Sequence, residues 1–194
     1  MRPINAQPTI ILASASPRRV QILQQMGFTC HVMPADIDES RLGRESPTEY
    51  VLRLAAHKAQ TVANMQAAQQ LNLPILAADT IVAFNDAIFG KPKNDADAVN
   101  MLKILSNTTH QVHTAVALVF NKQTHVALST TLVTMMPLTA TMIDSYIKSR
   151  EHVDKAGSYA IQGLAGSWIK HIAGSYTGVM GLPVFETGQL FSRL

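Results

Sequence analysis

The residues that could do chemistry begin with a polar and basic run near the start of the chain. Ser14 and Ser16 precede Pro17, and Arg18 and Arg19 follow it directly. Proline is favoured at the first position of a helix, and a helix start presents unpaired N–H groups and the positive end of the helix dipole. Two arginines there need negative partners. They either pair with carboxylates elsewhere in the chain or, together with the serine hydroxyls, bind phosphate oxygens.

Asp79 is a second candidate, because it interrupts the apolar stretch 75–84 next to Thr80. An unpaired carboxylate in such a strand would cost several kcal/mol to bury. Asp79 therefore needs a metal, a cation or water as its partner. A structural, hydrogen-bonded aspartate and a catalytic carboxylate both satisfy that requirement.

Acidic residues form a third candidate, at Asp36, Asp38 and Glu39. They make either a solvated loop or a magnesium site, because hard cations take oxygen ligands and share them with substrate phosphates. Lys58 lies on the apolar side of a predicted helix. Its stem is buried in either case, and its ammonium group reaches either the surface or a cleft.

The elements that must position these side chains mix strands and helices. Hydrophobic patterns predict strands over 10–12, 28–34, 75–84, 112–120, 124–138 and around 168–172. Capping signals predict helices from Pro17 to Gly27, from a capping box at Ser46 to about Gln70, after Asn94, from Thr139 to about Arg150, and after Pro183. Residues 174–178 are predicted to form a glycine-rich loop. The order of elements predicts an α/β fold with a mixed, strongly bent sheet.

Composition narrows the classes of function. The 194 residues carry a net charge of +3, but the basic residues are scattered and aromatic residues make up 6%, so nucleic acid is an unlikely partner. Cys30 is the single cysteine, which excludes an internal disulfide and a cysteine metal cluster. Since no run approaches the roughly 20 apolar residues of a membrane span, we expect no membrane partner and a cytoplasmic protein.

Several motifs in a fixed order resemble the Maf family of nucleoside triphosphate pyrophosphatases, over almost the whole chain. They lie at 14–19, 38–39, 53–59, 78–82, 90–92, 154–163 and 174–183. The last two are similar to the branch that acts on dTTP and UTP. The resemblance implies an elongated Maf/ITPase-like α/β fold, with residues 1–194 forming one domain of two lobes around a deep cleft, and it implies homodimers in many members.

The implied reaction is hydrolysis of dTTP, UTP or modified pyrimidine nucleotides between the α and β phosphorus atoms, with Mg²⁺ or Mn²⁺ as cofactor. The resemblance assigns Asp79 as the base that takes a proton from water, and Glu39 with Asp79 as metal ligands. The implied substrate-binding residues are Ser14, Ser16, Arg18, Arg19, Lys58, Thr80, Lys91, Lys155 and Gln162.

Gln162 bears on the choice of base. A primary amide offers one donor and one acceptor, which match the edge of uracil or thymine, whereas a carboxylate offers only acceptors. Two alternatives stay open: a 7-methyl-GTP pyrophosphatase of the sister branch, and a non-catalytic, nucleotide-binding inhibitor of septum formation. The sequence departs from the family pattern at Arg150-Glu151-His152, which leaves the shape of that loop undetermined.

Overall fold

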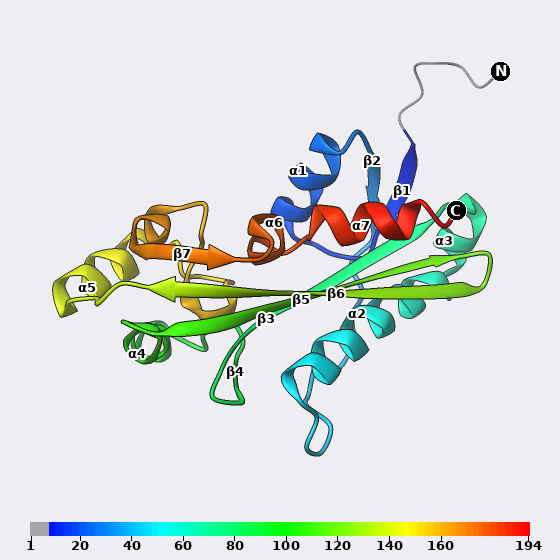
Figure 1. Ribbon diagram of the computed structural model, residues 1–194. Helices are drawn as coiled ribbons and strands as arrows, with labels where there is room; N and C mark the ends of the chain where they lie inside the picture. Colours follow the sequence, from blue (N-terminus) through cyan, green and yellow to red (C-terminus); the bar gives the residue numbers. More distant parts are fainter. Residues whose placement is uncertain (1–7) are drawn as a thin grey trace.

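Three long strands, β3, β5 and β6, form the axis of the structure, a computed structural model that describes residues 8–194 (Figure 1). The elements are, in order, β1 (Thr9–Leu12), α1 (Pro17–Gln25), β2 (Thr29–Val32), α2 (Pro47–Ala63), α3 (Gln66–Leu71), β3 (Ile75–Phe84), β4 (Ala87–Phe89), α4 (Asp95–Leu105), β5 (Thr109–Phe120), β6 (Gln123–Met135), α5 (Ala140–Ser149), the 3₁₀ helices η1 (Ala156–Ser158) and η2 (Leu164–Trp168), β7 (Ile169–Ala173), α6 (Tyr176–Met180) and α7 (Val184–Phe191). None of the helices within residues 8–194 combines the length and the apolar character that a membrane crossing requires.

The strands form one mixed, open sheet in the order β2-β1-β3-β5-β6-β7, and β4 pairs with β3 outside this path. Strand β1 runs parallel to β2 and β3, while all the other pairs are antiparallel. Helices α1, α6 and α7 lie over one face of the sheet and α2 lies over the other (Figure 1). The predicted α/β class with a mixed sheet flanked by helices is confirmed.

Local capping and turn chemistry explains why several elements begin and end where they do. Ser46 and Glu49 form the predicted capping box at the start of α2. The side chain of Asn94 caps α4, and that of Thr139 caps α5. The turn between β5 and β6 has positive φ at both central residues, Asn121 and Lys122, which is the geometry of a tight antiparallel hairpin.

Several predicted boundaries and one predicted loop were wrong. The helix after Ser46 does not continue to Gln70, because Met65 adopts an extended backbone (φ −73°, ψ 134°) and packs its side chain on the core, so α3 begins anew. Strand β2 covers only 29–32, and β6 stops at Met135, before Pro137, which has no N–H for the ladder. Strand β7 begins after Trp168, which ends η2. Residues 176–180 form α6 rather than a loop, because the Ser175 side chain accepts a hydrogen bond from Gly178 N–H at 2.9 Å.

The alternation of side chains along β3 divides the core into layers. Ile75, Ala77 and Ile81 belong to a buried cluster with the inner side of α2. Leu76 and Ala78 belong to a second cluster with α1 and α7 on the opposite face. A third cluster fills the far end of the sheet under α4 and α5. Strand β3 is thus buried on both faces, which explains its almost unbroken apolar sequence.

His110 on β5 makes the stability of this core depend on pH. It is buried, its Nε2 lies 2.7 Å from the Tyr159 hydroxyl, and its Nδ1 has no hydrogen-bond partner. Burial lowers the pKa of His110 from 6.5 to about 4. Between these values the unfolded chain binds a proton that the folded chain does not, so stability is full above pH 6.5 and is lost as the pH falls.

We expect protonation of His110 to lower the free energy of unfolding by on the order of 3 kcal/mol as the pH falls from 6.5 to about 4. Urea denaturation at a series of pH values measures it. In His110→Gln, which keeps a polar group beside Tyr159, the drop should be smaller by that amount. An equal pH dependence in both proteins would show that His110 is not responsible.

Candidate functional site

A gap in strand pairing exposes the middle of β3. On one side, β5 pairs with β3 from Ile75 to Ala83 without interruption. On the other side, β1 pairs with Ile75 and Leu76, and β4 pairs from Val82 onward. Residues 77–81 therefore face no strand of the described sheet on that side. Asp79 and Thr80 lie at the centre of this free edge, just beyond the carboxyl end of β1.

A pocket of about 910 Å³ opens at this free edge. Its volume is in the range of sites for small organic ligands. All of the predicted site residues line it: Ser14, Ser16, Arg18, Arg19, Glu39, Lys58, Asp79, Thr80, Lys91, Lys155 and Gln162. The fold thus brings together side chains that come from both ends of the sheet and from six separate stretches of sequence, at 14–19, 39, 58, 79–80, 91 and 155–162.

Adjacent positions on β3 serve opposite sides of the pocket. Asp79 shares the face of Ile75 and Ala77 and meets α2, from which Lys58 projects. Thr80 points to the other face, where its hydroxyl accepts a hydrogen bond from Arg19 at 3.2 Å. The period-two alternation of a strand produces this division.

Lys58 is the centre of an acidic and basic cluster. Its Nζ lies 2.6 Å from Asp79 Oδ1 and 2.6 Å from Glu39 Oε1. Asp79 is 7% exposed, whereas the side chain of Glu39 is 54% exposed. The buried carboxylate thus has a cation as its partner, which is one of the three kinds of partner that the sequence allowed, and the second carboxylate reaches the same point from the solvent side.

Burial raises the pKa of Asp79 above its ordinary value, and the neighbouring Glu39 adds to this effect. Lys58 and Arg19 act in the opposite direction, because a nearby positive charge favours the carboxylate. Asp79 is therefore a stronger base than an exposed aspartate, held in a position that opens to the pocket.

The start of α1 forms one wall of the pocket. The helix has no side-chain cap and no acidic residue in its first turn, so its first N–H groups and its dipole favour an anion. Arg19 donates hydrogen bonds to Gly181 O, Ser14 Oγ and Thr80 Oγ1 at 2.8, 2.9 and 3.2 Å. Within residues 8–194 neither Arg18 nor Arg19 has a carboxylate within ion-pair distance. Pairing of the two arginines with carboxylates is thus not what the structure shows.

Lys91 and Lys155 add further cations to the lining of the pocket. Burial lowers the pKa of Arg18, and it also lowers the pKa of Lys155, to which the positive charges of Arg18 and Lys91 contribute. Gly90 O, next to Lys91, accepts a hydrogen bond from Gly157 N–H at 3.1 Å. Only glycine fits at 157, because φ is +67° and a Cβ would lie 2.8 Å from Val82 Cγ2. This contact joins the Lys91 and Lys155 segments.

The segment that carries Gln162 is anchored on both sides of that residue. Ala160 N–H donates to the Tyr146 hydroxyl at 3.1 Å, and Leu164 N–H donates to Glu151 Oε2 at 2.8 Å. The Gln162 side chain itself is exposed. The loop at 150–152, where the sequence departs from the family pattern, is fixed by pairing of Arg150 and His152 with Asp95.

Some residues of the pocket were missed by the sequence analysis. Tyr50, Asp154 and Tyr159 also line it. Tyr50 was not selected as a site residue, and Asp154 and Tyr159 lie in the motif at 154–163, from which only Lys155 and Gln162 were selected. Thr114 does not line the pocket but donates to Gly178 O at 2.7 Å and lies 3.0 Å from the hydroxyl of Thr80; it carried no signal in the sequence because threonine is common in strands.

The donor set suits a hard divalent cation. Glu39 and Asp79 place carboxylate oxygens around one point, and within residues 8–194 no group of three or more His, Cys, Asp or Glu side chains converges. Magnesium usually binds one or two carboxylates and completes its shell with water and substrate phosphates. Two carboxylates beside a cation-lined pocket fit that pattern.

The amino-acid sequence of this chain matches one protein family and several proteins that share one name. The family model described as "Maf: Maf-like protein" matches residues 9–194. A protein of Methylobacillus flagellatus named dTTP/UTP pyrophosphatase is 49% identical over 93% of this chain and 90% of its own. Proteins of the same name from Pseudoalteromonas atlantica and Bordetella avium are 47% and 48% identical, over 95% and 96% of this chain and 96% and 95% of theirs.

Among solved structures, the Staphylococcus aureus Ham1 protein has a TM-score of 0.45 and 15% identity. The match covers 66% of this chain and 71% of that one. A likeness this distant carries no inference about the pocket.

The contact between Lys58 and Asp79 leads to a prediction that can be tested without a bound ligand. We expect the pKa of Asp79 to lie above the value of about 3.9 of an exposed aspartate, and to rise further in Lys58→Met, which removes the nearest positive charge. Titration of the Asp79 carboxyl carbon by nuclear magnetic resonance measures both values. Lys103→Met, at an exposed position on α4, is the matched control and should leave the pKa unchanged. A lower pKa in Lys58→Met would contradict this account of the cluster.

Proposed function

We propose, from the premise that this chain belongs to the Maf family, that it is a nucleoside triphosphate pyrophosphatase acting on dTTP and UTP. It hydrolyses the bond between the α and β phosphates and releases the nucleoside monophosphate and pyrophosphate. Relatives at 47–49% identity that span nearly all of the chain carry the name of this activity.

One observation carries the proposal: a buried carboxylate, Asp79, opens into a pocket that several basic side chains also line. A nucleoside triphosphate carries several negative charges, so its binding needs several cations. Arg18, Lys91 and Lys155 provide them, together with the N-terminus of α1. A site that only bound phosphate would have no use for a carboxylate with a raised pKa at the same place.

Asp79 acts as the general base. It takes a proton from a water molecule as the water oxygen forms a bond to the α-phosphorus. The bond from the α-phosphorus to the bridging oxygen breaks, and its electron pair leaves with pyrophosphate. The raised pKa of Asp79 makes the ionised group a better proton acceptor, and Lys58 holds the carboxylate in place.

Glu39 and Asp79 are the residues that would hold a divalent cation, Mg²⁺ or Mn²⁺. When bound, this cation supplies positive charge for the phosphate oxygens and for the leaving pyrophosphate. The Lys58 ammonium group has three N–H donors, so it can keep its contact with Asp79 and also donate to a phosphate oxygen of the substrate.

The single sheet that passes through both ends of the molecule supports one domain with two lobes around the pocket (Figure 1). Of its proposed range, 1–194, residues 1–7 lie outside the described residues. The homodimer and the cytoplasmic location stay predictions from the sequence.

Asp79→Asn should retain nucleotide binding and lose most of its turnover. The amide is nearly isosteric but is a poor proton acceptor, and the loss of a positioned base costs about a hundredfold to ten-thousandfold in rate. Pyrophosphate release from dTTP with Mg²⁺ measures kcat, and thermal stabilisation by dTTP measures binding. Asp144→Asn, which changes an exposed carboxylate on α5, is the matched control. Near-native turnover in folded Asp79→Asn would remove Asp79 from this role.

Gln162→Glu tests how the pocket selects the base. A carboxylate cannot donate to a carbonyl of uracil or thymine, and a mispaired polar edge costs roughly 1 to 3 kcal/mol per group, or about tenfold to a hundredfold in kcat/KM. We expect kcat/KM to fall for dTTP and UTP relative to 7-methyl-GTP. Gln189→Glu, at an exposed position on α7, is the control. An unchanged ranking of substrates would mean that Gln162 does not contact the base.

A further inference from the structure

The loop that carries Glu39 has no regular structure of its own. Residues 36–45, which we call the Glu39 loop, connect β2 to α2, and most of their side chains are exposed. The Glu39 carboxylate nevertheless lies 2.6 Å from Lys58 Nζ, at the centre of the pocket's acidic and basic cluster. The position of this carboxylate therefore depends on the contacts that hold the backbone of the loop.

Arg53 on α2 makes contacts that can do so. Its Nε and Nη2 donate to the two carboxylate oxygens of Glu45 at 2.5 and 2.8 Å, and Nη2 also donates to Ser40 O at 3.0 Å. A two-pronged arginine–carboxylate contact fixes direction as well as distance. Arg53 thereby holds the loop at one of its ends and at the residue next to Glu39.

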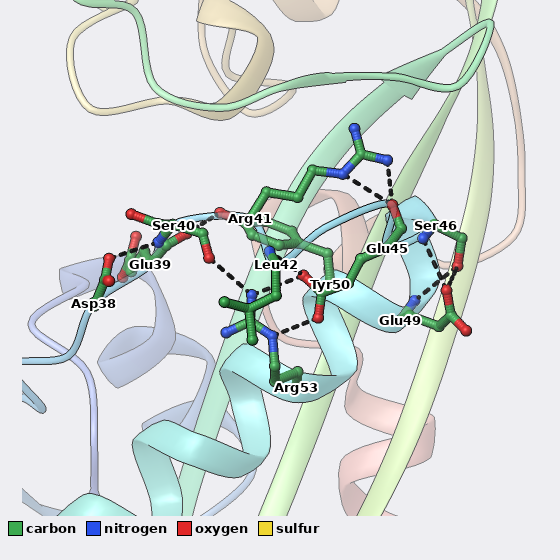
Figure 2. Close-up of polar contacts among 10 residues, drawn as sticks. All are labelled: Asp38, Glu39, Ser40, Arg41, Leu42, Glu45, Ser46, Glu49, Tyr50 and Arg53. Carbon is green, nitrogen blue, oxygen red and sulfur yellow. Dashed lines mark hydrogen bonds and ion pairs between the residues drawn. The ribbon is translucent and has the colours of Figure 1, made fainter.

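Tyr50 contributes a parallel contact one turn earlier on α2. Its hydroxyl donates to Glu39 O at 2.7 Å, and the Arg53 guanidinium lies 5.5 Å from the centre of the Tyr50 ring. Figure 2 shows the loop passing over the first turns of α2, with the Arg53, Glu45 and Tyr50 contacts beneath it. Tyr50 lines the pocket, whereas Arg53 does not.

Glu45 organises its own end of the loop. Its Oε2 accepts from Leu42 N–H at 3.0 Å, and its backbone carbonyl accepts hydrogen bonds from the Arg41 guanidinium. Arg53 and the Leu42 N–H lower the pKa of Glu45 to about 2, so its charge persists throughout the neutral range. Arg53 is therefore paired with an ionised partner under all working conditions.

Arg53 is not needed to start the helix. The capping box of Ser46 and Glu49 already satisfies the first turn of α2, with Ser46 N–H bonded to Glu49 Oε2 at 2.8 Å. The hydrogen bonds that Arg53 donates go to Ser40 and Glu45 in the loop rather than to the helix end. These hydrogen bonds therefore affect the position of Glu39 rather than the start of the helix.

We propose that Arg53 is a positioning residue for the metal site: acting through Glu45 and Ser40, it holds the Glu39 loop so that the Glu39 carboxylate stays beside Asp79. This inference rests on the proposed function insofar as Glu39 serves as a metal ligand there. Groups behind a metal ligand, when removed, commonly weaken metal binding by about tenfold to a hundredfold.

The test compares Arg53→Gln with Arg44→Gln in the full chain. Arg44 lies in the same loop and is exposed, and within residues 8–194 it makes no hydrogen bond or ion pair with a side chain. The two variants thus remove the same charge from the same region. The probe is Mn²⁺, titrated with electron paramagnetic resonance detection in the presence of α,β-methylene-dUTP, which cannot be hydrolysed at that bond.

We expect the Kd of Mn²⁺ to rise about tenfold in Arg53→Gln and to change by less than about twofold in Arg44→Gln. Glu45→Gln should reproduce the effect, and the double variant should add little to either single change, because both remove one interaction. Tyr50→Phe, which keeps the ring and loses only the hydroxyl bond to Glu39, should shift the Kd in the same direction by a smaller factor.

Melting temperature separates positioning from simple stability. A lower Tm in Arg53→Gln with an unchanged Kd of Mn²⁺ would overturn the inference. Fully additive effects of Arg53→Gln and Glu45→Gln on this Kd would also overturn it. The same holds if the native chain does not bind Mn²⁺ in the presence of the analogue. If Arg53→Gln does not fold, Tyr50→Phe and Glu45→Gln decide in its place. Absence of pyrophosphate release by the native chain would refute the proposed function alone, because the Mn²⁺ titration does not depend on turnover.

Discussion

The contact between Lys58 and Asp79 is the interaction on which the pocket depends. A carboxylate in a strand that is buried on both faces must have a cation beside it, because desolvation otherwise drives it to the neutral form. Lys58 supplies that cation at 2.6 Å from α2, the helix that covers this face of β3. The same pairing keeps a basic carboxylate where a ligand can reach it, so one contact serves both the fold and the chemistry.

The free edge of β3 explains why the ligand can reach that carboxylate. Strand β1 ends its pairing at Leu76 and β4 begins at Val82, so the stretch between them borders the pocket instead of another strand. The chain leaves the end of β1 into α1, which turns its positive end toward the same opening. Clefts beyond the carboxyl ends of parallel strands bind ligands in many α/β proteins for this reason.

The sequence predicted the features that depend on local chemistry and missed those that depend on tertiary contacts. The capping box at Ser46 and the apolar β3 are each encoded within a few residues. The break at Met65 and the short helix after Ser175 arise from packing and from a cap within a glycine-rich stretch, which patterns of hydrophobicity do not register. The site residues were chosen from motifs, and the structure brings them to one pocket. No spacing indicated that Arg53 holds the Glu39 loop, because its partner Glu45 lies before the helix starts, where helical periodicity predicts no contacts.

The central claim is that Asp79 directs water to the α-phosphorus. The most direct test is hydrolysis of dTTP in ¹⁸O-labelled water, followed by ³¹P nuclear magnetic resonance of both products. The account predicts the label in the phosphate of dTMP, with none in pyrophosphate, because the water oxygen bonds to the α-phosphorus and the bridging oxygen leaves. Label in pyrophosphate would place the attack on the β-phosphorus and contradict it.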